Sequence, residues 1–265
     1  MSYAAADEKR LLKPMGKSLH EYTSILSGST SSLVIHPLPY MLRFLERKPW
    51  FRNSVYRRWA EKRSMQFPPF DRGVHESIVK YSDYHRFGAI AMALRRIDGE
   101  NIPGAFAEAG VFQGHASRFI HRLAPERRYY LFDTFEGFDK DDLDPEVSED
   151  NRFRSTSVEA VLHFIGDQRN LVVKKGRVPE TFTGLESERF AFVLLDMDLY
   201  KPTFSALEFF YPRLSIGGYL MVHDYHNEES DWACRRAVDE FMQNKPERII
   251  EIADIWGSII FRRLC

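Results

Sequence analysis

Four ionisable side chains follow two apolar segments in the C-terminal half of the chain, at residues 190–195 and 218–222. They are Asp196 and Asp198 after the first segment, and His223 and Asp224 after the second. Carboxylate oxygens and imidazole nitrogens can hold a divalent metal ion, and both groups can take a proton from a substrate. These residues are therefore candidates for metal binding and for general-base chemistry.

The chain between the two segments predicts how these side chains are positioned. We expect a helix over residues 202–214, because Pro202 suits a first helical turn and apolar residues follow at helical spacing. A strand–helix–strand crossover makes the two strands parallel, so their carboxyl ends meet at one edge of a sheet, where ligands bind. Strand-end acids can also be mere helix caps or solvated groups. The predicted convergence of four ionisable groups favours a metal-binding or catalytic role over capping and solvation.

The same alternation of strands and helices extends over most of the chain. The expected strands cover residues 104–109, 128–133, 170–175, 190–196, 218–224, 248–252 and 258–262. The expected helices cover residues 84–97, 114–123, 158–166, 202–214 and 233–243, and a capping box of Thr156 and Glu159 is expected before the third. The pattern predicts an α/β fold with a mostly parallel, doubly wound, seven-stranded sheet. The last strand is expected to be antiparallel, because residues 254–257 are too short for a crossover.

Composition places the chain among globular proteins. It has 265 residues, of which 44% are apolar and 28% charged, and its formal net charge of −1 argues neither for nor against nucleic acid. Its two cysteines, Cys234 and Cys265, do not make a disulfide scaffold. The N-terminus lacks a signal-peptide pattern, and no apolar run approaches the roughly 20 residues that span a bilayer. We expect no transmembrane segment and a cytoplasmic location.

The motif Phe-Pro-Pro-Phe at residues 67–70 divides the chain into two predicted parts. Residues 1–70 are expected to form a partly helical N-terminal extension that serves as a lid or an oligomer contact. Residues 71–265 are expected to form the catalytic domain, and we expect a homodimer. Residues 43–63 are basic with interleaved aromatics. A solvated helical face or a contact with a sister subunit is favoured there; an anionic membrane, RNA or an anionic acceptor are the alternatives.

A glycine-containing turn follows the first expected strand and precedes a helix. Gly110 and Gly114 allow a tight turn and let a ligand approach main-chain N–H groups. Asp133, at the end of the second strand, is placed to accept hydrogen bonds from ribose hydroxyls. The dinucleotide pattern Gly-x-Gly-x-x-Gly is absent, and Glu108 before the turn suits a cationic amino group better than a diphosphate. The pattern favours S-adenosylmethionine as ligand, with a turn that binds nothing as the alternative.

These motifs resemble those of class I S-adenosylmethionine-dependent methyltransferases, and more narrowly the macrocin O-methyltransferase (TylF-like) family. The resemblance covers roughly residues 72–263 and rests on four segments, at residues 106–114, 131–138, 194–203 and 217–225. It implies a Rossmann-like seven-stranded fold. It also implies methylation of a sugar hydroxyl, which is what this family carries out on macrolide and aminocoumarin antibiotics.

The resemblance further implies roles for single residues. Asp196 would be a metal ligand and Asp198 the general base. The family's next metal ligands are two adjacent acids, and this chain has His223 and Asp224 there. Imidazole suits Mn²⁺, Fe²⁺ or Zn²⁺ better than Mg²⁺. Three arrangements remain open: a softer metal, Mg²⁺ on Asp196 and Asp224 alone, or no metal with His223 or His226 as base. We expect a divalent metal, Mg²⁺ first, with Mn²⁺ or Fe²⁺ as alternatives.

Other candidates carry weaker signals. Ser117 opens the helix after the turn and could bind the methionine carboxylate or only cap the helix. Arg177 follows the third strand, where the resemblance implies contact with the adenine. Tyr84, His85 and Arg86 precede the first strand, and either the acceptor or a plain helix surface explains them.

The sequence therefore predicts an S-adenosylmethionine-dependent O-methyltransferase that acts on a hydroxyl, expected to be a sugar or polyol of a small molecule or glycoside. An RNA methyltransferase that uses residues 43–63 and a non-catalytic cofactor-binding protein are the alternatives, and nucleic acid is the less favoured acceptor. Acceptor choice is expected to reside in the N-terminal extension, in residues 138–155 and in the segment after Asp224.

Overall fold

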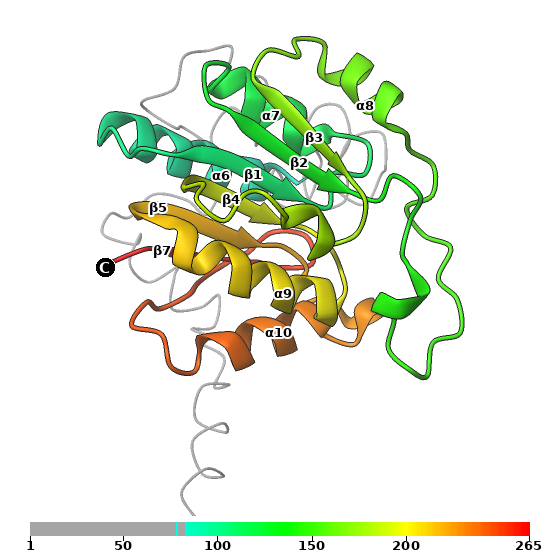
Figure 1. The fold of residues 1–265 in the computed structure, drawn as a ribbon. Helices are drawn as coiled ribbons and strands as arrows, with labels where there is room; N and C mark the ends of the chain where they lie inside the picture. The colour runs from blue at the N-terminus through cyan, green and yellow to red at the C-terminus, as the bar shows by residue number, and fades with distance from the viewer. Residues whose placement is uncertain (1–77, 79–82) are drawn as a thin grey trace, which may run out of the picture. The chain divides into compact units, whose positions relative to one another are not determined.

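The computed structural model describes Ile78 and residues 83–265. The predicted N-terminal extension, its basic segment at residues 43–63 and the boundary motif at residues 67–70 lie outside the described residues. The elements described below carry the labels of Figure 1.

One seven-stranded sheet organises the described residues, in the strand order β3-β2-β1-β4-β5-β7-β6 (Figure 1). The strands are β1 (Ala105–Ala109), β2 (Tyr129–Asp133), β3 (Leu171–Lys175), β4 (Phe190–Leu195), β5 (Leu214–Val222), β6 (Ile250–Ile252) and β7 (Ser258–Arg262). Strands β1 to β5 pair in parallel, whereas β7 pairs antiparallel with both β5 and β6. The predicted mostly parallel sheet with an antiparallel last strand is confirmed.

Helices cover both faces of this sheet. They are α6 (Tyr84–Gly99), α7 (His115–Leu123), α8 (Val158–Ile165), α9 (Tyr200–Phe210) and α10 (Ala233–Met242). Helices α6, α7 and α8 pack as a row on one face, and α9 packs with α10 on the other (Figure 1). No helix in the described part of the chain is long and apolar enough to cross a bilayer.

Strand β4 lies at the centre of the sheet because its sequence is apolar throughout. All its residues, from Phe190 to Leu195, are fully buried. A parallel strand covered on both faces has such a continuous apolar run. Around it, Phe132 of β2 and Phe210 of α9 pack edge to face with their ring centroids 5.9 Å apart. The residues that follow β4 are therefore held by the most buried part of the molecule.

The predicted capping box before α8 is wrong. Ser157 is the N-cap residue, and its Oγ accepts a hydrogen bond from the backbone N–H of Ala160 at 3.1 Å. The hydroxyl of Thr156 instead donates to the carbonyl oxygen of Phe112 in the glycine-containing turn. A tertiary contact thus competes with the local capping pattern and fixes the chain before α8 against the turn.

The boundary between α9 and β5 also differs from the prediction. Helix α9 begins at Tyr200, with Pro202 in its first turn, and ends at Phe210. A single 3₁₀ turn, Tyr211–Arg213, follows, and Leu214, which was expected in the helix, opens β5. Pro212 explains the early end, because proline cannot continue the hydrogen-bond pattern of an α-helix.

Candidate active site

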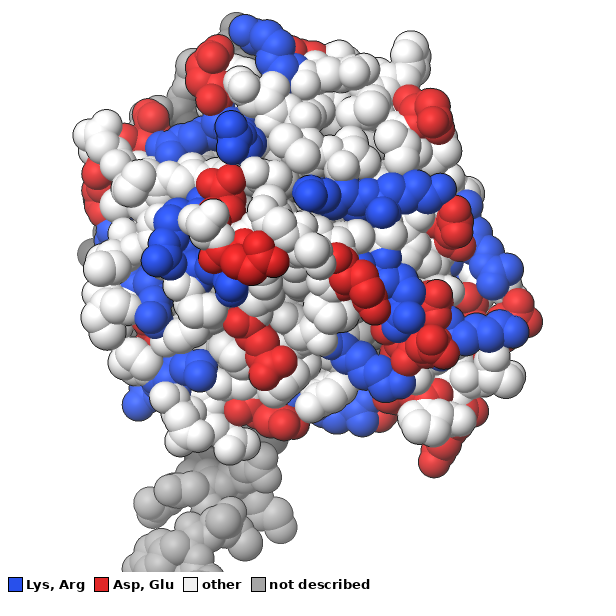
Figure 2. Space-filling view, in the orientation of Figure 1, with Lys and Arg blue, Asp and Glu red and all other residues white. Residues whose placement is uncertain are grey.

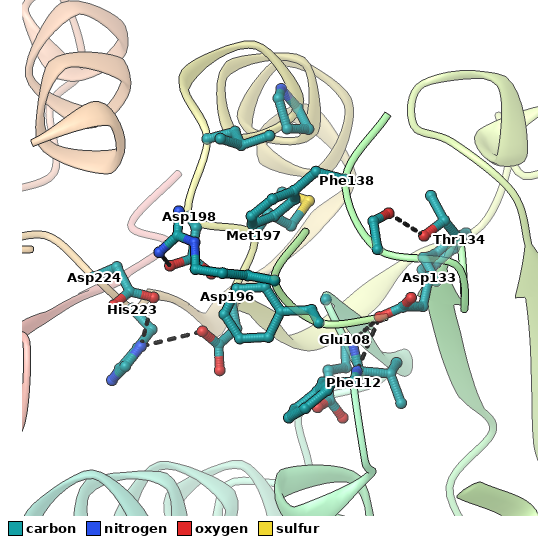
Figure 3. A pocket seen from close by; sticks show the side chains of 18 of the residues that line it. Glu108, Phe112, Asp133, Thr134, Phe138, Asp196, Met197, Asp198, His223 and Asp224 are labelled. Atoms are coloured by element: carbon teal, nitrogen blue, oxygen red, sulfur yellow. Dashed lines mark hydrogen bonds and ion pairs between the residues drawn. The ribbon is translucent and has the colours of Figure 1, made fainter. Parts of the chain in front are cut away.

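A cavity of about 400 Å³ lies at the carboxyl ends of the parallel strands. This volume falls within the range of small-molecule and cofactor sites. The residues predicted from the sequence that line it are Glu108, Gly110, Asp133, Arg177, Asp196, Asp198, His223 and Asp224. Figure 3 shows the acids of β4 and β5 on one side and Asp133 on the other. Gly114 and Ser117 do not line the cavity.

The predicted convergence of four ionisable groups follows from the pairing of β4 with β5. The two strands are parallel, and Leu195 is in register with Val222. The backbone N–H of His223 donates to the carbonyl oxygen of Leu195 at 2.8 Å, which extends the ladder by one residue. Asp196 and His223 therefore leave adjacent strands at the same level of the sheet edge.

The imidazole of His223 is fixed on both of its nitrogens, and Figure 3 shows the contacts with Asp196 and Asp224. Its Nδ1 lies 2.8 Å from Oδ2 of Asp224 and 3.1 Å from Oδ1 of Asp196, and its Nε2 lies 3.0 Å from the carbonyl oxygen of Ile255. A carbonyl oxygen only accepts, so Nε2 carries the proton of that bond. Burial opposes charging of the ring, but the charge of Asp196 and its hydrogen bond raise the pKa of His223 well above its ordinary value. Neither nitrogen is free to act as a general base.

The spacing of the ligand atoms fits a divalent cation. Oδ1 of Asp196, Nδ1 of His223 and Oδ2 of Asp224 form one of the groups with metal-ligand spacing among the described residues. Neighbouring ligands on an octahedral ion with bonds of about 2.1 Å stand about 3.0 Å apart, close to the 2.8 and 3.1 Å found here. The Nε2–H bond to a carbonyl is also the usual outer contact of a histidine ligand.

A second group with metal-ligand spacing shares the same histidine. Asp83 and Asp254 lie on the Nε2 side of His223. Because Nε2 already donates to the carbonyl oxygen of Ile255, its lone pair is not available there. The group formed by Asp196, His223 and Asp224 is thus the better candidate.

Asp198 is a buried carboxylate with weak contacts. Its Oδ1 accepts a long hydrogen bond of 3.4 Å from Nδ2 of Asn227 and lies 3.9 Å from Nη1 of Arg152. Burial, followed by repulsion from Asp224 and Asp196, raises the pKa of Asp198 to about 8, although Arg152 opposes the shift. A carboxylate with a raised pKa is a stronger base than an exposed one.

The glycine-containing turn is held in place by Asp133. Its Oδ2 accepts hydrogen bonds from the backbone N–H groups of Val111 and Phe112 at 2.7 and 2.9 Å, and its Oδ1 accepts one from that of Phe135 at 2.6 Å. A carboxylate has about four acceptor positions, so room remains for a further donor. Gly110 has φ +88°, and a Cβ there would lie 1.8 Å from the carbonyl oxygen of Asp196. Only glycine fits.

Glu108 lies at the end of β1 and is 1% exposed. Its Oε2 accepts hydrogen bonds from Oγ of Ser117 at 2.7 Å and from the hydroxyl of Tyr129. Burial outweighs the two hydrogen bonds and raises the pKa of Glu108 to about 8. Ser117 thus contacts Glu108, and Gly114, with φ +77°, is the N-cap of α7.

Arg86 is a site residue that the sequence marked only weakly. Its Nη1 donates to Oδ2 of Asp196 at 2.8 Å, across 110 positions of the chain, and it lines the cavity. Burial opposes its charge, yet Asp196 and Asp83 raise the pKa of Arg86 above its ordinary value. The pKa of Asp196 is correspondingly held well below its ordinary value, despite burial, by His223 and Arg86. The only signal in the sequence was the polar run Tyr84, His85 and Arg86 at the start of the helix that precedes the first strand.

Residues 138–155, here called the acidic loop, form another wall of the cavity. Phe138, Arg152 and Phe153 of this loop line it. The guanidinium carbon of Arg152 lies 5.3 Å from the ring centroid of Phe138 and 5.6 Å from that of Phe153. Arg177 contacts the loop through Asp142, with Nη2 to Oδ1 at 2.6 Å. The role of Arg177 at the adenine stays a prediction; its described contacts tie the loop down.

The model of the family described as macrocin-O-methyltransferase (TylF) matches residues 80–263. The chain belongs to this family. The residues matched by the macrocin O-methyltransferase family thus contain the whole sheet and every cavity residue discussed above.

Named relatives carry the same reaction class in their names. A Streptomyces olivaceus 8-demethyl-8-(2,3-dimethoxy-alpha-L-rhamnosyl)-tetracenomycin-C 4'-O-methyltransferase is 29% identical over 59% of this chain and 64% of the relative. The chain therefore spans less than two thirds of that relative. Mycinamicin III 3''-O-methyltransferase of Micromonospora griseorubida is 30% identical over 58% of this chain and 66% of the relative. Demethyldecarbamoylnovobiocin O-methyltransferase of Streptomyces niveus is 26% identical over 72% and 75%.

Two solved structures support the fold. The O-methyltransferase NovP matches with a TM-score of 0.58 and 25% identity, over 69% of this chain and 81% of that one. The calicheamicin methyltransferase CalS11 matches with the same TM-score of 0.58 at 19% identity, over 89% of this chain and 98% of that one. Both matches support the fold described above.

Proposed function

We propose that this protein transfers a methyl group from S-adenosylmethionine to a sugar hydroxyl of a small-molecule glycoside. The family supports the reaction class, and the rhamnosyl group in the name of the Streptomyces olivaceus relative supports a sugar acceptor. The observation that carries the proposal is the place of Asp198. It is a buried carboxylate with a raised pKa, in the same cavity as the glycine-containing turn.

The residues around the turn suit the parts of S-adenosylmethionine, which supplies an already activated methyl group. Gly110 lets the turn pack directly against the backbone of Asp196, and Asp133 keeps acceptor capacity for ribose hydroxyls while it holds the turn. Glu108 lines the cavity and offers a carboxyl oxygen to the amino group. Ser117 positions Glu108, and Gly114 starts the helix whose N-terminus favours negative groups.

In this proposal Asp198 takes the proton of the acceptor hydroxyl. Its weak contacts with Asn227 and Arg152 leave oxygen lone pairs available to the acceptor hydroxyl. The carboxylate form that accepts the proton predominates above the raised pKa of about 8. Asn227 links Asp198 to Asp224, because its amide also donates to Oδ1 of Asp224 at 3.1 Å. A positioned general base of this kind contributes about 10²–10⁴ in rate.

Asp196, His223 and Asp224 would hold the divalent cation, since their ligand atoms fit its geometry. A cation bound there lowers the pKa of a hydroxyl that it contacts. Because one ligand is an imidazole, the set suits Mn²⁺ or Fe²⁺ better than Mg²⁺, and the order of preference expected from the sequence is reversed in this proposal. His223 then acts as a ligand rather than as a base. His226 does not line the cavity.

The test compares Asp198→Asn with Asp98→Asn, an exposed acid at the end of α6. Turnover would be followed by mass spectrometry on a panel of deoxysugar glycosides with free hydroxyls. Asp198→Asn is expected to lose about 10²–10⁴ in turnover and to keep its calorimetric affinity for S-adenosylhomocysteine, whereas Asp98→Asn behaves as wild type. Normal turnover in Asp198→Asn would exclude this base. Absence of cofactor binding in the wild type would exclude the proposed function altogether.

The RNA alternative has less support. It relies on residues 43–63, which lie outside the described residues, and the three relatives are not named for nucleic-acid acceptors. On the face shown in Figure 2, basic and acidic side chains are interspersed rather than gathered into one basic surface. Nucleic-acid-binding domains usually carry a continuous basic patch.

A further inference from the structure

Arg86 projects from α6 and is fixed at the edge of the sheet by two acids. Its side chain is 16% exposed, its Nη1 donates to Oδ2 of Asp196 at 2.8 Å, and its Nε lies 3.3 Å from Oδ2 of Asp83. A cation held in this way has little conformational entropy left to lose when it binds a ligand.

The guanidinium of Arg86 keeps donors available. A guanidinium has five N–H groups in a planar fork. Nη2 of Arg86 has no hydrogen-bond partner among the described residues, and Nη1 uses one of its two N–H groups on Asp196. Because Arg86 lines the cavity, these donors are available to a ligand there.

The surroundings of Arg86 show which ligand group would meet it. Glu108 lines the same cavity and is close enough to Arg86 for their charges to interact. Ala116, in the first turn of α7, lines the same cavity, and the N-terminal end of a helix favours an anion. An acid and a base that lie close together match an α-amino acid group, whose ammonium and carboxylate are borne by one carbon. In S-adenosylmethionine only the methionine moiety carries such a pair.

We propose that Arg86 binds the α-carboxylate of the cofactor's methionine moiety while it keeps its ion pair with Asp196. The fork of the guanidinium then bridges two carboxylates, one from the ligand and one from the protein. Glu108 faces the ammonium of the same moiety. This assignment rests on the cofactor use proposed above and adds the residue that recognises the charged end of the cofactor.

A pair of ligands that differ only in the carboxylate tests this role. Calorimetry would compare S-adenosylmethionine with decarboxylated S-adenosylmethionine, which keeps the ammonium, on wild type and on Arg86→Gln. Charge-assisted hydrogen bonds predict that Arg86→Gln binds S-adenosylmethionine about 10- to 100-fold more weakly. Its affinity for the decarboxylated ligand is expected to stay at the wild-type value.

Two further variants make the comparison specific. Arg86→Lys keeps the charge but not the fork, so it is expected to lose part of the preference for the carboxylated ligand. It also serves if Arg86→Gln does not fold, as thermal unfolding would show. Arg95→Gln removes an exposed arginine of the same helix and is expected to bind both ligands as wild type does.

Equal weakening of both ligands in Arg86→Gln or Arg86→Lys would overturn the proposal, because Arg86 would then act only through Asp196 and the fold. Unchanged binding of both ligands would overturn it as well. Failure of the wild type to bind S-adenosylmethionine would instead contradict the proposed function, so the two failures are distinguishable.

Discussion

His223 stands where the resemblance to the family implies an acid, and its contacts define what an imidazole changes there. With Nε2 bonded to a backbone carbonyl, only Nδ1 can ligate, and it faces both Asp196 and Asp224. A mixed nitrogen and oxygen set favours Mn²⁺ or Fe²⁺, whereas three carboxylates favour Mg²⁺.

This difference predicts the metal preference of one variant. His223→Asp is expected to bind Mg²⁺ more tightly than wild type and to lose preference for Mn²⁺, because an oxygen ligand replaces the imidazole. Competitive calorimetric titration of Mg²⁺ against Mn²⁺ measures the ratio of the two affinities, and His226→Asp, an exposed histidine nearby, is the control. An unchanged ratio in His223→Asp would remove His223 from the ligand set.

Glu108 predicts how stability depends on pH. Its folded-state pKa is raised from 4.5 to about 8, so between these values the folded protein binds a proton that the unfolded chain lacks. Stability is expected to fall as pH rises from about 4.5 to 8, on the order of 1.4 kcal/mol for each unit of the shift. Glu108→Gln, which keeps an acceptor for Ser117 and Tyr129, is expected to flatten this dependence. Urea unfolding at pH 5.5 and pH 8 measures it; parallel curves for both proteins would contradict the assignment.

For single residues, the sequence predicted which side chains belong to the site better than it predicted their hydrogen-bond partners. Asp196, Asp198, His223 and Asp224 were placed together because strand ends and crossover rules follow from local patterns. The bond of Ser117 to Glu108 and the reach of Arg86 to Asp196 depend on side-chain directions in the packed fold. Those directions have no local signature, so Arg86 was only a weak candidate.

Among the elements, the acidic loop is held by cations from three different parts of the chain. Arg177, after β3, binds Asp142 at 2.6 Å, and Arg236 of α10 binds Asp144 at 2.9 Å. Lys201, in the first turn of α9, donates to the carbonyl oxygen of Asp141 at 2.6 Å. The loop closes one side of the cavity through these polar contacts, together with the buried Leu143 and the packing of Phe138 against Phe153.

Loosening one of these contacts should be visible in the loop. Arg177→Gln is expected to speed amide exchange at Asp142 and Leu143 about five- to tenfold, because a partly buried ion pair contributes on the order of 1 kcal/mol. Hydrogen exchange with mass spectrometry measures this. Arg169→Gln, which removes an exposed pair with Asp167, is the control and is expected to leave the loop unchanged. Equal exchange in both variants would show that Arg177 does not hold the loop.

At the glycine-containing turn, two costs of an added side chain can be measured separately. One is the strain of a positive φ, and the other is the clash of a Cβ with a neighbouring atom. Gly110 and Gly166 have nearly the same φ, +88° and +87°, but a Cβ at Gly110 meets the carbonyl oxygen of Asp196 and one at Gly166 meets nothing within 4 Å. Gly166→Ala is expected to cost about 1–3 kcal/mol from its backbone conformation alone, because φ +87° with ψ −77° is rare for residues with a Cβ. Gly110→Ala should cost clearly more and abolish cofactor binding, as urea unfolding and calorimetry would measure. Equal losses would mean that the turn adapts.

For the whole molecule, the number of strands and their directions followed from the sequence, because helical crossovers make strands parallel and residues 254–257 are too short for one. The order of the strands in the sheet was not predicted. The ends of elements did not follow as well. Pro212 stops α9 and lets β5 begin at Leu214, and Thr156 leaves its cap position for a bond to Phe112. The first is a local effect of proline that the apolar spacing of residues 202–214 concealed, whereas the second depends on a contact with a distant segment. The homodimer stays a prediction, which light scattering on the full chain would measure.

The cavity wall is built partly from the ends of buried strands and partly from the acidic loop. This division bears on how such a protein could acquire new acceptors. The acids and the histidine leave buried parallel strands, whereas Phe138, Arg152 and Phe153 sit on a surface loop tied by side-chain ion pairs. Loops accept insertions and exchanges far more readily than central strands do. Exchange of residues 138–155 between family members, with Asp142 and Asp144 retained, is therefore a direct route to altered acceptor range with the chemistry left in place.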